Sequence, residues 1–248
     1  MTPFLIVGMP RTGSTLLFSG LAQHPDVRIY SEVFHPVRSE RTGGHAIRRN
    51  GSSISFDETR DDAIRFLDEI VFPPSETRAA VGCKIFAEYV RCAGTEGLFQ
   101  RLRDHYKTLH VIHVVRQNYL DVLVSREVAD KTQEWARYTA TPPAPAPALT
   151  IDAAAAENFF EYMKVADHFF EAFFRPDLYL KLGYEDLSKD YAATISLVYD
   201  FLGLEQRTAM MRVFKQIREP FSEIISNYQE LKSHFQNSEF GVFFPEAA

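Results

Sequence analysis

The chain has 248 residues, 46% of them hydrophobic and 24% charged, which is enough to bury one sizeable core. Its net charge of -6 gives no reason to expect a nucleic-acid partner, so any anionic ligand must be held by a local cluster of donors. The N-terminus MTPFLIVGMP lacks the features of a signal peptide, and no apolar run is long enough to span a bilayer. We therefore expect a cytoplasmic protein without stable membrane insertion.

The cysteines point away from a disulfide framework and from a metal site. The chain has two, Cys83 and Cys92, both close together in sequence. A pair in a domain of this size is typical of reduced thiols that pack in the interior. No set of Cys and His has the spacing of zinc ligands, so we expect no metal.

The first part of the chain predicts a strand, a loop, a helix and a second strand. Phe4–Gly8 is a continuous apolar run ending in glycine, as in a buried parallel strand. The loop MPRT follows, and a helix is expected from Gly13 until Pro25 ends it. Val27–Tyr30 predicts a short strand that carries Glu32 to its carboxyl end.

The rest of the chain alternates between strand and helix patterns. Residues 37–57 are polar without periodicity, and residues 139–151 include the run TPPAPAPA, so we expect two mobile segments there. The remaining predicted elements are strands over Ala80–Ala87, Leu109–Val115 and Leu178–Leu182, and helices over Glu58–Val71, Glu96–Tyr106, Asn118–Ala129, Glu157–Phe174, Tyr191–Leu202 and Gln206–Ile217. This order predicts a single α/β domain over residues 1–248, with a parallel β-sheet flanked by helices on both faces.

The loop after the first strand has the frame of a phosphate-binding loop. Residues 8–15, GMPRTGST, match the pattern G-x-x-x-x-G-K-[ST] between a strand and a helix, except at Ser14. Backbone N–H groups of such a loop and the helix N-terminus form a cradle for an anion. The sheet is therefore expected to be of the P-loop type.

Two departures from that pattern argue against a nucleotide triphosphatase. Ser14 stands where such enzymes have the lysine that reaches the β- and γ-phosphates. Arg116, rather than an aspartate able to hold Mg²⁺, follows the strand LHVIHVV. A P-loop kinase or hydrolase and a non-catalytic nucleotide-binding module remain as alternative functions.

Two segments resemble the sulfotransferase superfamily. FLIVGMPRTGSTLLFSGLAQHPDV resembles its 5′-phosphosulfate loop, and HVIHVVRQNYLDVLVSREVA is similar to its 3′-phosphate motif. Arg116 and Ser125 lie nine residues apart, as in bacterial carbohydrate sulfotransferases of the trehalose and nodulation-factor kind, whereas animal cytosolic and heparan-type enzymes have eight. The resemblance implies a sulfotransferase that uses 3′-phosphoadenosine-5′-phosphosulfate (PAPS), releases the bisphosphate PAP and requires no metal.

The resemblance also assigns the cofactor contacts. The 5′-phosphosulfate is expected to be wrapped by Arg11, Thr12, Gly13, Ser14 and Thr15. The 3′-phosphate is expected to be bound by Arg116, whose guanidinium can bind phosphate in a bidentate manner, and by the Ser125 hydroxyl. Tyr184, in a Y-E-D-L segment, is placed near the adenine, and Asn227 in a C-terminal segment that closes over the cofactor. A core tyrosine is an equally good interpretation of Tyr184.

Three side chains are candidates for the chemistry of sulfonate transfer. Glu32 follows the turn HPDV, where carbohydrate and tyrosyl-protein enzymes of the family keep a glutamate base, although it could be a surface carboxylate. His35 is close enough to be an alternative base or to bind the acceptor. Lys84 lies inside an apolar strand, and by resemblance supports the leaving group, although a lysine at a strand edge is an alternative. The acceptor is expected to be a small molecule or saccharide, by resemblance a carbohydrate or glycolipid hydroxyl, with an acyl-chain or metabolite hydroxyl still open.

Overall fold

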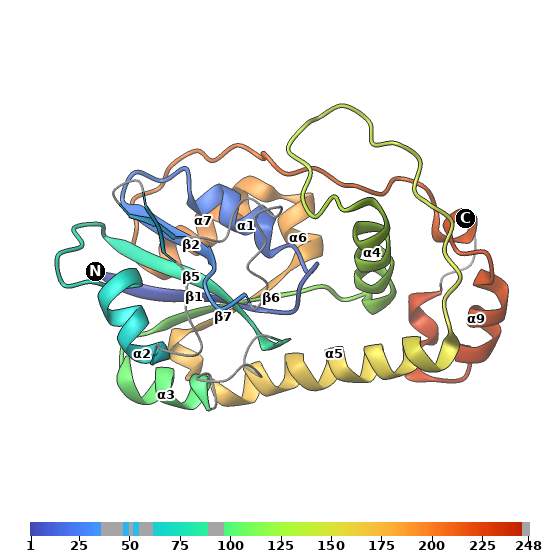
Figure 1. Cartoon of the computed structure of the whole chain (residues 1–248), viewed down its shortest axis with the longest axis horizontal. Coiled ribbons are helices and arrows are strands. Elements are labelled where there is room, and N and C mark those ends of the chain that lie inside the picture. The colour runs from blue at the N-terminus through green and yellow to red at the C-terminus, as the bar shows by residue number, and fades with distance from the viewer. Residues whose placement is uncertain (36–46, 50–51, 55–61, 89–96, 245–248) are drawn as a thin grey trace.

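The central sheet of the protein is parallel throughout. A computed structural model of the chain describes residues 1–35, 47–49, 52–54, 62–88 and 97–244 (Figure 1). Five strands lie in the order β2-β5-β1-β6-β7, and a separate hairpin pairs β3 with β4. Their bounds are β1 (Thr2–Gly8), β2 (Val27–Glu32), β3 (Ile47–Arg49), β4 (Ser52–Ile54), β5 (Ala80–Phe86), β6 (His110–Val115) and β7 (Tyr179–Gly183).

Helices pack on both faces of this sheet, which confirms the predicted fold class. Across the described residues they are α1 (Ser14–Leu21), α2 (Ala63–Phe66), the π-helical turn η1 (Leu67–Val71), α3 (Leu98–His105), α4 (Tyr119–Thr132), α5 (Ala153–Phe173), the 3₁₀ turn η3 (Pro176–Leu178), α6 (Tyr184–Lys189), α7 (Tyr191–Leu202), α8 (Phe221–Ile224), α9 (Tyr228–Phe235) and the 3₁₀ turn η4 (Glu239–Phe243). One face is covered by α1, α6 and α7, and the other by α2, η1, α3 and the end of α5 (Figure 1). No helix within these ranges is long and apolar enough to cross a membrane.

The central strand β1 supplies side chains to both layers of the core. Phe4 and Ile6 pack against the face that carries α1 and α7, whereas Leu5 and Val7 point to the face that carries α3. All four side chains are fully buried, as expected for a strand with helices on both sides. This packing holds the carboxyl end of β1, and the loop that follows it, at a fixed position.

A third core lies beside the sheet, between α4, α5, α9 and η4. The ring of Phe160 on α5 is at its centre, with centroids 5.4 Å from Phe235, 5.3 Å from Phe240 and 5.3 Å from Phe243. In Figure 1, α5 runs from beneath the sheet to this outer core. The phenylalanines of the predicted helix Glu157–Phe174 are thus mostly core residues.

Two local expectations differ from the structure, and the predicted mobility of residues 139–151 stays a prediction. The segment 206–217 is irregular rather than helical, and the backbone of Phe214 pairs with Arg137 in an isolated bridge. Part of the predicted loop 37–57 forms the hairpin β3–β4, while the rest of it lies outside the described residues. The connector 139–151 is without helix or strand but is tied down, for example by the Lys131 ammonium, which donates to the Ala148 carbonyl at 2.9 Å. Cys83 is a buried free thiol, as expected, and Cys92 lies outside the described residues.

Candidate active site

A cavity of about 400 Å³ lies at the carboxyl ends of β1, β6 and β7. The connection after β1 leads to β2 at one edge of the sheet, whereas the connection after β6 leads to β7 at the other edge. The two connections therefore diverge between the neighbouring strands β1 and β6. Such a switch in strand order opens a crevice at the carboxyl edge, where α/β proteins commonly bind ligands. The cavity therefore lies where the fold favours a binding site.

The loop between β1 and α1 curves sharply at the edge of this cavity. Gly8 has φ 142°, and a Cβ there would come within 2.6 Å of the Val114 carbonyl oxygen. Gly13 has φ 100°, and its Cβ would come within 2.6 Å of the Tyr184 ring. Both positions therefore require glycine. The Thr12 hydroxyl donates to the Met9 carbonyl at 2.8 Å, which closes the turn from within.

The N-terminus of α1 is open toward the cavity. Gly13 is its N-cap residue and offers no side-chain hydrogen bond to the first turn. The cavity is lined there by Gly13, Ser14 and Thr15. The unsatisfied N–H groups and the positive end of the helix dipole make this a place for an anion.

Arg11 connects the phosphate loop to three other walls of the cavity. Its Nε donates to the Ser125 hydroxyl at 3.0 Å, and its two terminal nitrogens donate to the Trp135 carbonyl and to the Gln216 side-chain oxygen. Burial and then the nearby charge of Arg116 lower the pKa of Arg11 to about 10. Arg11 therefore stays charged at neutral pH, in a place where its charge is poorly solvated.

Arg116 and Tyr184 form the opposite wall. The guanidinium of Arg116 lies 4.3 Å from the centroid of the Tyr184 ring and pairs with the Asp121 carboxylate at 2.9 Å. Glu185 accepts a hydrogen bond from the Gln117 backbone N–H at 3.0 Å, which joins the ends of β6 and β7. Tyr184 therefore contacts both the phosphate loop and Arg116. Arg116 thus forms an ion pair with Asp121 and also lines the cavity.

Glu32 and Lys84 form a buried ion pair next to the cavity. The Lys84 Nζ lies 3.1 Å from Glu32 Oε1, and their side chains are only 2% and 13% exposed. The same ammonium donates to the hydroxyl of Thr15 at 3.3 Å, and Thr15 lines the cavity. Burial lowers the pKa of Lys84, an effect that the carboxylate of Glu32 partly offsets. The pair thus contacts the phosphate loop through one shared hydroxyl.

Local strand pairing explains how Glu32 meets Lys84. The two residues are partners in the β2–β5 register, but the register shifts between Tyr30 and Glu32. The extra residue, Ser31, turns the Glu32 side chain toward β5. The sequence predicted both charged residues separately, and the structure brings them together.

Five predicted site residues lie outside the cavity lining: the Glu32–Lys84 pair described above, Thr12, His35 and Asn227. Thr12 is buried behind the loop, and His35 is held near Glu32 by its backbone N–H, which donates to the Glu32 carbonyl at 3.1 Å. The side-chain amide of Asn227 is hydrogen-bonded to Ile151. It donates to the Ile151 carbonyl at 2.8 Å and accepts from the Ile151 backbone N–H at 3.1 Å. The structure thus gives Asn227 a role in anchoring the connector after residue 148.

The sequence interpretation missed one whole wall of the cavity. Two irregular segments form it, residues 135–137 and 211–221, and they carry the cations Arg137, Lys215 and Arg218. The signal was the pairing of basic and aromatic residues in EWARY and VFKQIREPF. In the whole lining, five cationic side chains face two carboxylates, although the chain as a whole is acidic.

These features suit a ligand with more than one phosphate-like group. The loop and α1 offer N–H donors at one end, and Arg116 with Ser125 offers donors at another, with Arg11 bonded to Ser125 between them. The described residues contain no group of three or more His, Cys, Asp or Glu placed to hold a metal ion. The Lys of triphosphate-binding loops is replaced by the small Ser14.

Comparison with known proteins decides between the remaining classes, because the sequence matches the Sulfotransferase family over residues 3–208. The chain belongs to the sulfotransferase family. It is 28% identical over 259 residues to Nodulation protein H of Rhizobium meliloti strain 1021, an alignment that covers 98% of this chain and 94% of the relative. Nodulation protein H of Rhizobium tropici is also 28% identical, with 98% of this chain and 92% of the relative covered. The predicted superfamily and the similarity to the nodulation type are both confirmed.

Solved structures of sulfotransferases have the same fold. A sulfotransferase from Alicyclobacillus acidocaldarius superposes with a TM-score of 0.55 at 17% identity, covering 97% of this chain and 94% of that one. The mouse sulfotransferase SULT7A1 superposes with a TM-score of 0.50 at 13% identity, covering 98% and 87%. These structures show the fold, whereas the family match over residues 3–208 shows that the protein is an enzyme of the sulfotransferase class and sets the kinase alternative aside.

Proposed function

We propose that this sulfotransferase uses PAPS as donor and transfers its sulfonate to a carbohydrate hydroxyl, with Glu32 as the base. The proposal rests mainly on one observation. A single cavity joins the loop residues Arg11, Gly13, Ser14 and Thr15 to Arg116 and Ser125, which lie far downstream in the sequence. PAPS carries a 5′-phosphosulfate and a 3′-phosphate, so its binding needs two such sets of hydrogen-bond donors. The mouse relative in the same fold was crystallised with PAP.

The residues of the cavity fit such a donor. The N–H groups of the loop and of the first turn of α1 would hold the 5′ end, and Arg116 and Ser125 the 3′-phosphate. When bound, PAPS supplies a sulfonate attached to a phosphate leaving group. Arg11, held between these two regions, adds a charge that is poorly screened by water and is therefore strong toward an anion.

The Glu32–Lys84 pair supports the chemistry at the 5′ end. In this proposal the Glu32 carboxylate takes the proton of the attacking hydroxyl, the usual task of a positioned base. The Lys84 ammonium, bonded to both Glu32 and Thr15, holds the carboxylate against the phosphate loop and contributes positive charge beside it. His35 remains the alternative base, since its backbone is bonded to that of Glu32.

The carbohydrate acceptor is supported by the nine-residue spacing of Arg116 and Ser125, by which the chain resembles bacterial carbohydrate sulfotransferases of the trehalose and nodulation-factor kind. It is tested by incubating the enzyme with labelled PAPS and a panel of acceptors that includes saccharides, a long-chain alcohol and a phenol. We expect label on saccharides, with undiminished transfer in EDTA. Transfer confined to the alcohol or the phenol would contradict the carbohydrate assignment, and loss of transfer in EDTA would contradict the metal-free one.

The donor is tested separately by calorimetry with PAP and AMP. We expect PAP to bind far more tightly, because AMP lacks the group that Arg116 and Ser125 would hold. Equal affinity for the two nucleotides would show that these residues do not bind a 3′-phosphate.

A further inference from the structure

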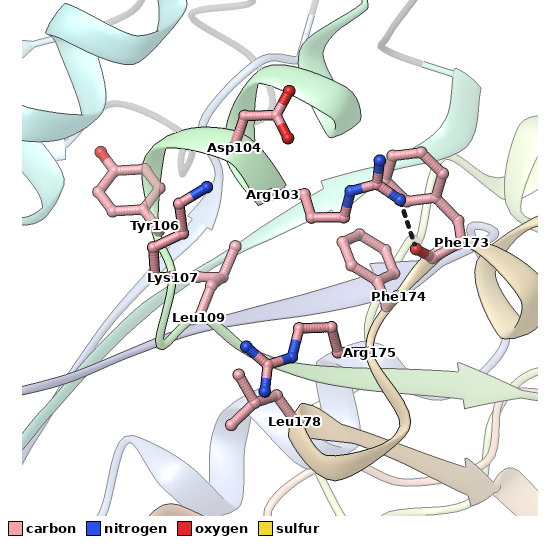
Figure 2. A pocket seen from close by; sticks show the side chains of 9 residues that line it. All are labelled: Arg103, Asp104, Tyr106, Lys107, Leu109, Phe173, Phe174, Arg175 and Leu178. Carbon is pink, nitrogen blue, oxygen red and sulfur yellow. Dashed lines mark hydrogen bonds between the residues drawn. The ribbon is translucent and has the colours of Figure 1, made fainter.

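A second cavity, of about 370 Å³, lies at the opposite edge of the sheet. It is formed near the amino ends of β6 and β7, by the end of α3, the turn that enters β6, and the end of α5 (Figure 2). Its lining shares no residue with that of the first cavity. A donor bound at the phosphate loop would therefore leave this hollow open.

Three cationic side chains surround the hollow. Arg103 and Lys107 come from the end of α3 and the turn that follows it, and Arg175 comes from the segment after α5; Figure 2 shows them around the same central space. The lining contains one carboxylate, Asp104, which accepts a hydrogen bond from the Gln100 amide at 2.6 Å. This excess of positive charge is local, since the chain carries a net charge of -6.

The two arginines are held in place by neighbouring groups. The guanidinium of Arg103 lies 4.5 Å from the centroid of the Phe173 ring and donates to the Phe173 carbonyl at 3.2 Å (Figure 2). Arg175 pairs with Asp177 through two hydrogen bonds, of 3.1 and 2.6 Å, which leaves N–H groups of the same guanidinium for another acceptor. Among the described residues Lys107 has no ion-pair partner.

The rest of the wall is apolar and aromatic. Phe174 and Leu109 are nearly buried, and Phe173, Tyr106 and Leu178 complete the wall. A hollow of this volume with apolar walls and a few convergent polar groups is typical of sites for small organic ligands. A simple inorganic ion would leave the aromatic wall unused.

We propose that this hollow is a second anion site, which binds an organic phosphate or sulfate ester with a planar apolar group. The ester oxygens would accept hydrogen bonds from Lys107 and Arg175, while the apolar group packs on Phe173 and Phe174. The site is separate from donor binding, so it can be occupied while the first cavity holds a nucleotide.

Calorimetry on the full chain, with PAP present to saturate the first cavity, tests this proposal. Phenyl phosphate and phenyl sulfate are the organic probes, and inorganic phosphate is the comparison. We expect saturable binding of at least one ester, and at least about tenfold weaker binding of inorganic phosphate, which lacks the packed ring. The two esters distinguish a phosphate from a sulfate ligand.

Variants show whether binding occurs at this hollow. Lys107→Gln and Arg175→Gln should each weaken ester binding by about tenfold, the usual effect of losing a charge-assisted hydrogen bond. Lys232→Gln on α9 is the matched control and should leave binding unchanged. Arg103 is not altered, because it caps the end of α5.

Three results would overturn the proposal: no saturable ester binding, ester binding that both variants leave unchanged, or equal binding of ester and inorganic phosphate. Failure of PAP to bind would contradict the proposed donor instead. It would not affect the dependence of ester binding on Lys107 and Arg175.

Discussion

Replacing Glu32 by Gln removes the carboxylate that faces a lysine with almost no contact with water. The Lys84 side chain is 2% exposed and its Nζ lies 3.1 Å from the Glu32 oxygen. Removing one partner of a buried pair leaves an uncompensated charge and costs about 3–5 kcal/mol. Domains of this kind are stable by only about 5–15 kcal/mol, so Glu32→Gln should reduce the free energy of unfolding substantially.

The loss should depend on pH, with a sign fixed by Lys84. Burial already holds the pKa of Lys84 below its ordinary value of 10.5, and Glu32 raises it, so the pKa of Lys84 should be still lower in the variant. Between the folded pKa and about 10.5, the unfolded chain binds more protons than the folded one, and stability rises with pH. In Glu32→Gln this rise should begin at lower pH than in the wild type.

Urea unfolding of both proteins from about pH 7 to about pH 10 measures these two effects. Glu88→Gln is the control, because its partner Arg126 lies 2.9 Å away but the pair is 25% and 39% exposed, so the loss should stay below about 1 kcal/mol. Turnover of Glu32→Gln should fall by about 10²–10⁴ while PAP affinity is retained. If Glu32→Gln is no less stable than Glu88→Gln, the Lys84 charge is not desolvated and the reasoning is wrong.

Three further predictions concern the cavity. Arg116→Ala should weaken PAP binding by about 2–3 kcal/mol in calorimetry, whereas Arg126→Ala, on the following helix α4 and outside the cavity lining, should not; equal effects would contradict the assignment. Gly13→Ala should be more destabilising in urea unfolding than Gly97→Ala, because both glycines have positive φ but only Gly13 would meet a side chain; similar losses would exclude a clash with Tyr184. Trp135, the single tryptophan, lines the cavity, so its fluorescence should change on PAP binding; an unchanged spectrum in the presence of bound PAP would place the nucleotide elsewhere.

The connector 139–151 was predicted to be mobile, and this stays a prediction. The structure ties it at several points, including a hydrogen bond from the Ala146 backbone to Glu219, which itself lines the cavity. Limited proteolysis should cut the connector early, and nucleotide with acceptor should slow cutting more than nucleotide alone. Resistance in the free enzyme, or a pattern that no ligand changes, would identify it as a fixed connector.

Local patterns predicted the phosphate loop and the sheet well. The loop residues are adjacent in sequence, and the two glycines encode the turn directly, so GMPRTGST could be interpreted without any distant contact. The helix Tyr191–Leu202 was predicted at its observed bounds because its apolar spacing is regular. Arg116 was found because it directly follows a strongly apolar predicted strand, in a segment similar to the 3′-phosphate motif of the family.

Features decided by distant contacts could not be predicted in the same way. Segment 206–217 contains apolar residues at near-helical spacing, but Phe214 pairs with the backbone of Arg137, a contact invisible in sequence. The hydrogen bonds between the Asn227 amide and the backbone of Ile151 join residues far apart in sequence and were not foreseen, and the assignment of Asn227 to the cofactor stays a prediction. The Glu32–Lys84 pair depends on a register shift at Ser31 that no pattern indicated.

The long helix α5 limits how far the chain can be shortened from its C-terminus. Its Phe170 packs in the core beneath the sheet, while its Phe160 contacts Phe235 and Phe240, which lie beyond the last residue, 208, of the family match. A fragment ending at 208 would leave the Phe160 half of this helix exposed to water, with the loss of several aromatic contacts. A shortened form of the protein should therefore retain η4, even though the family match ends at residue 208.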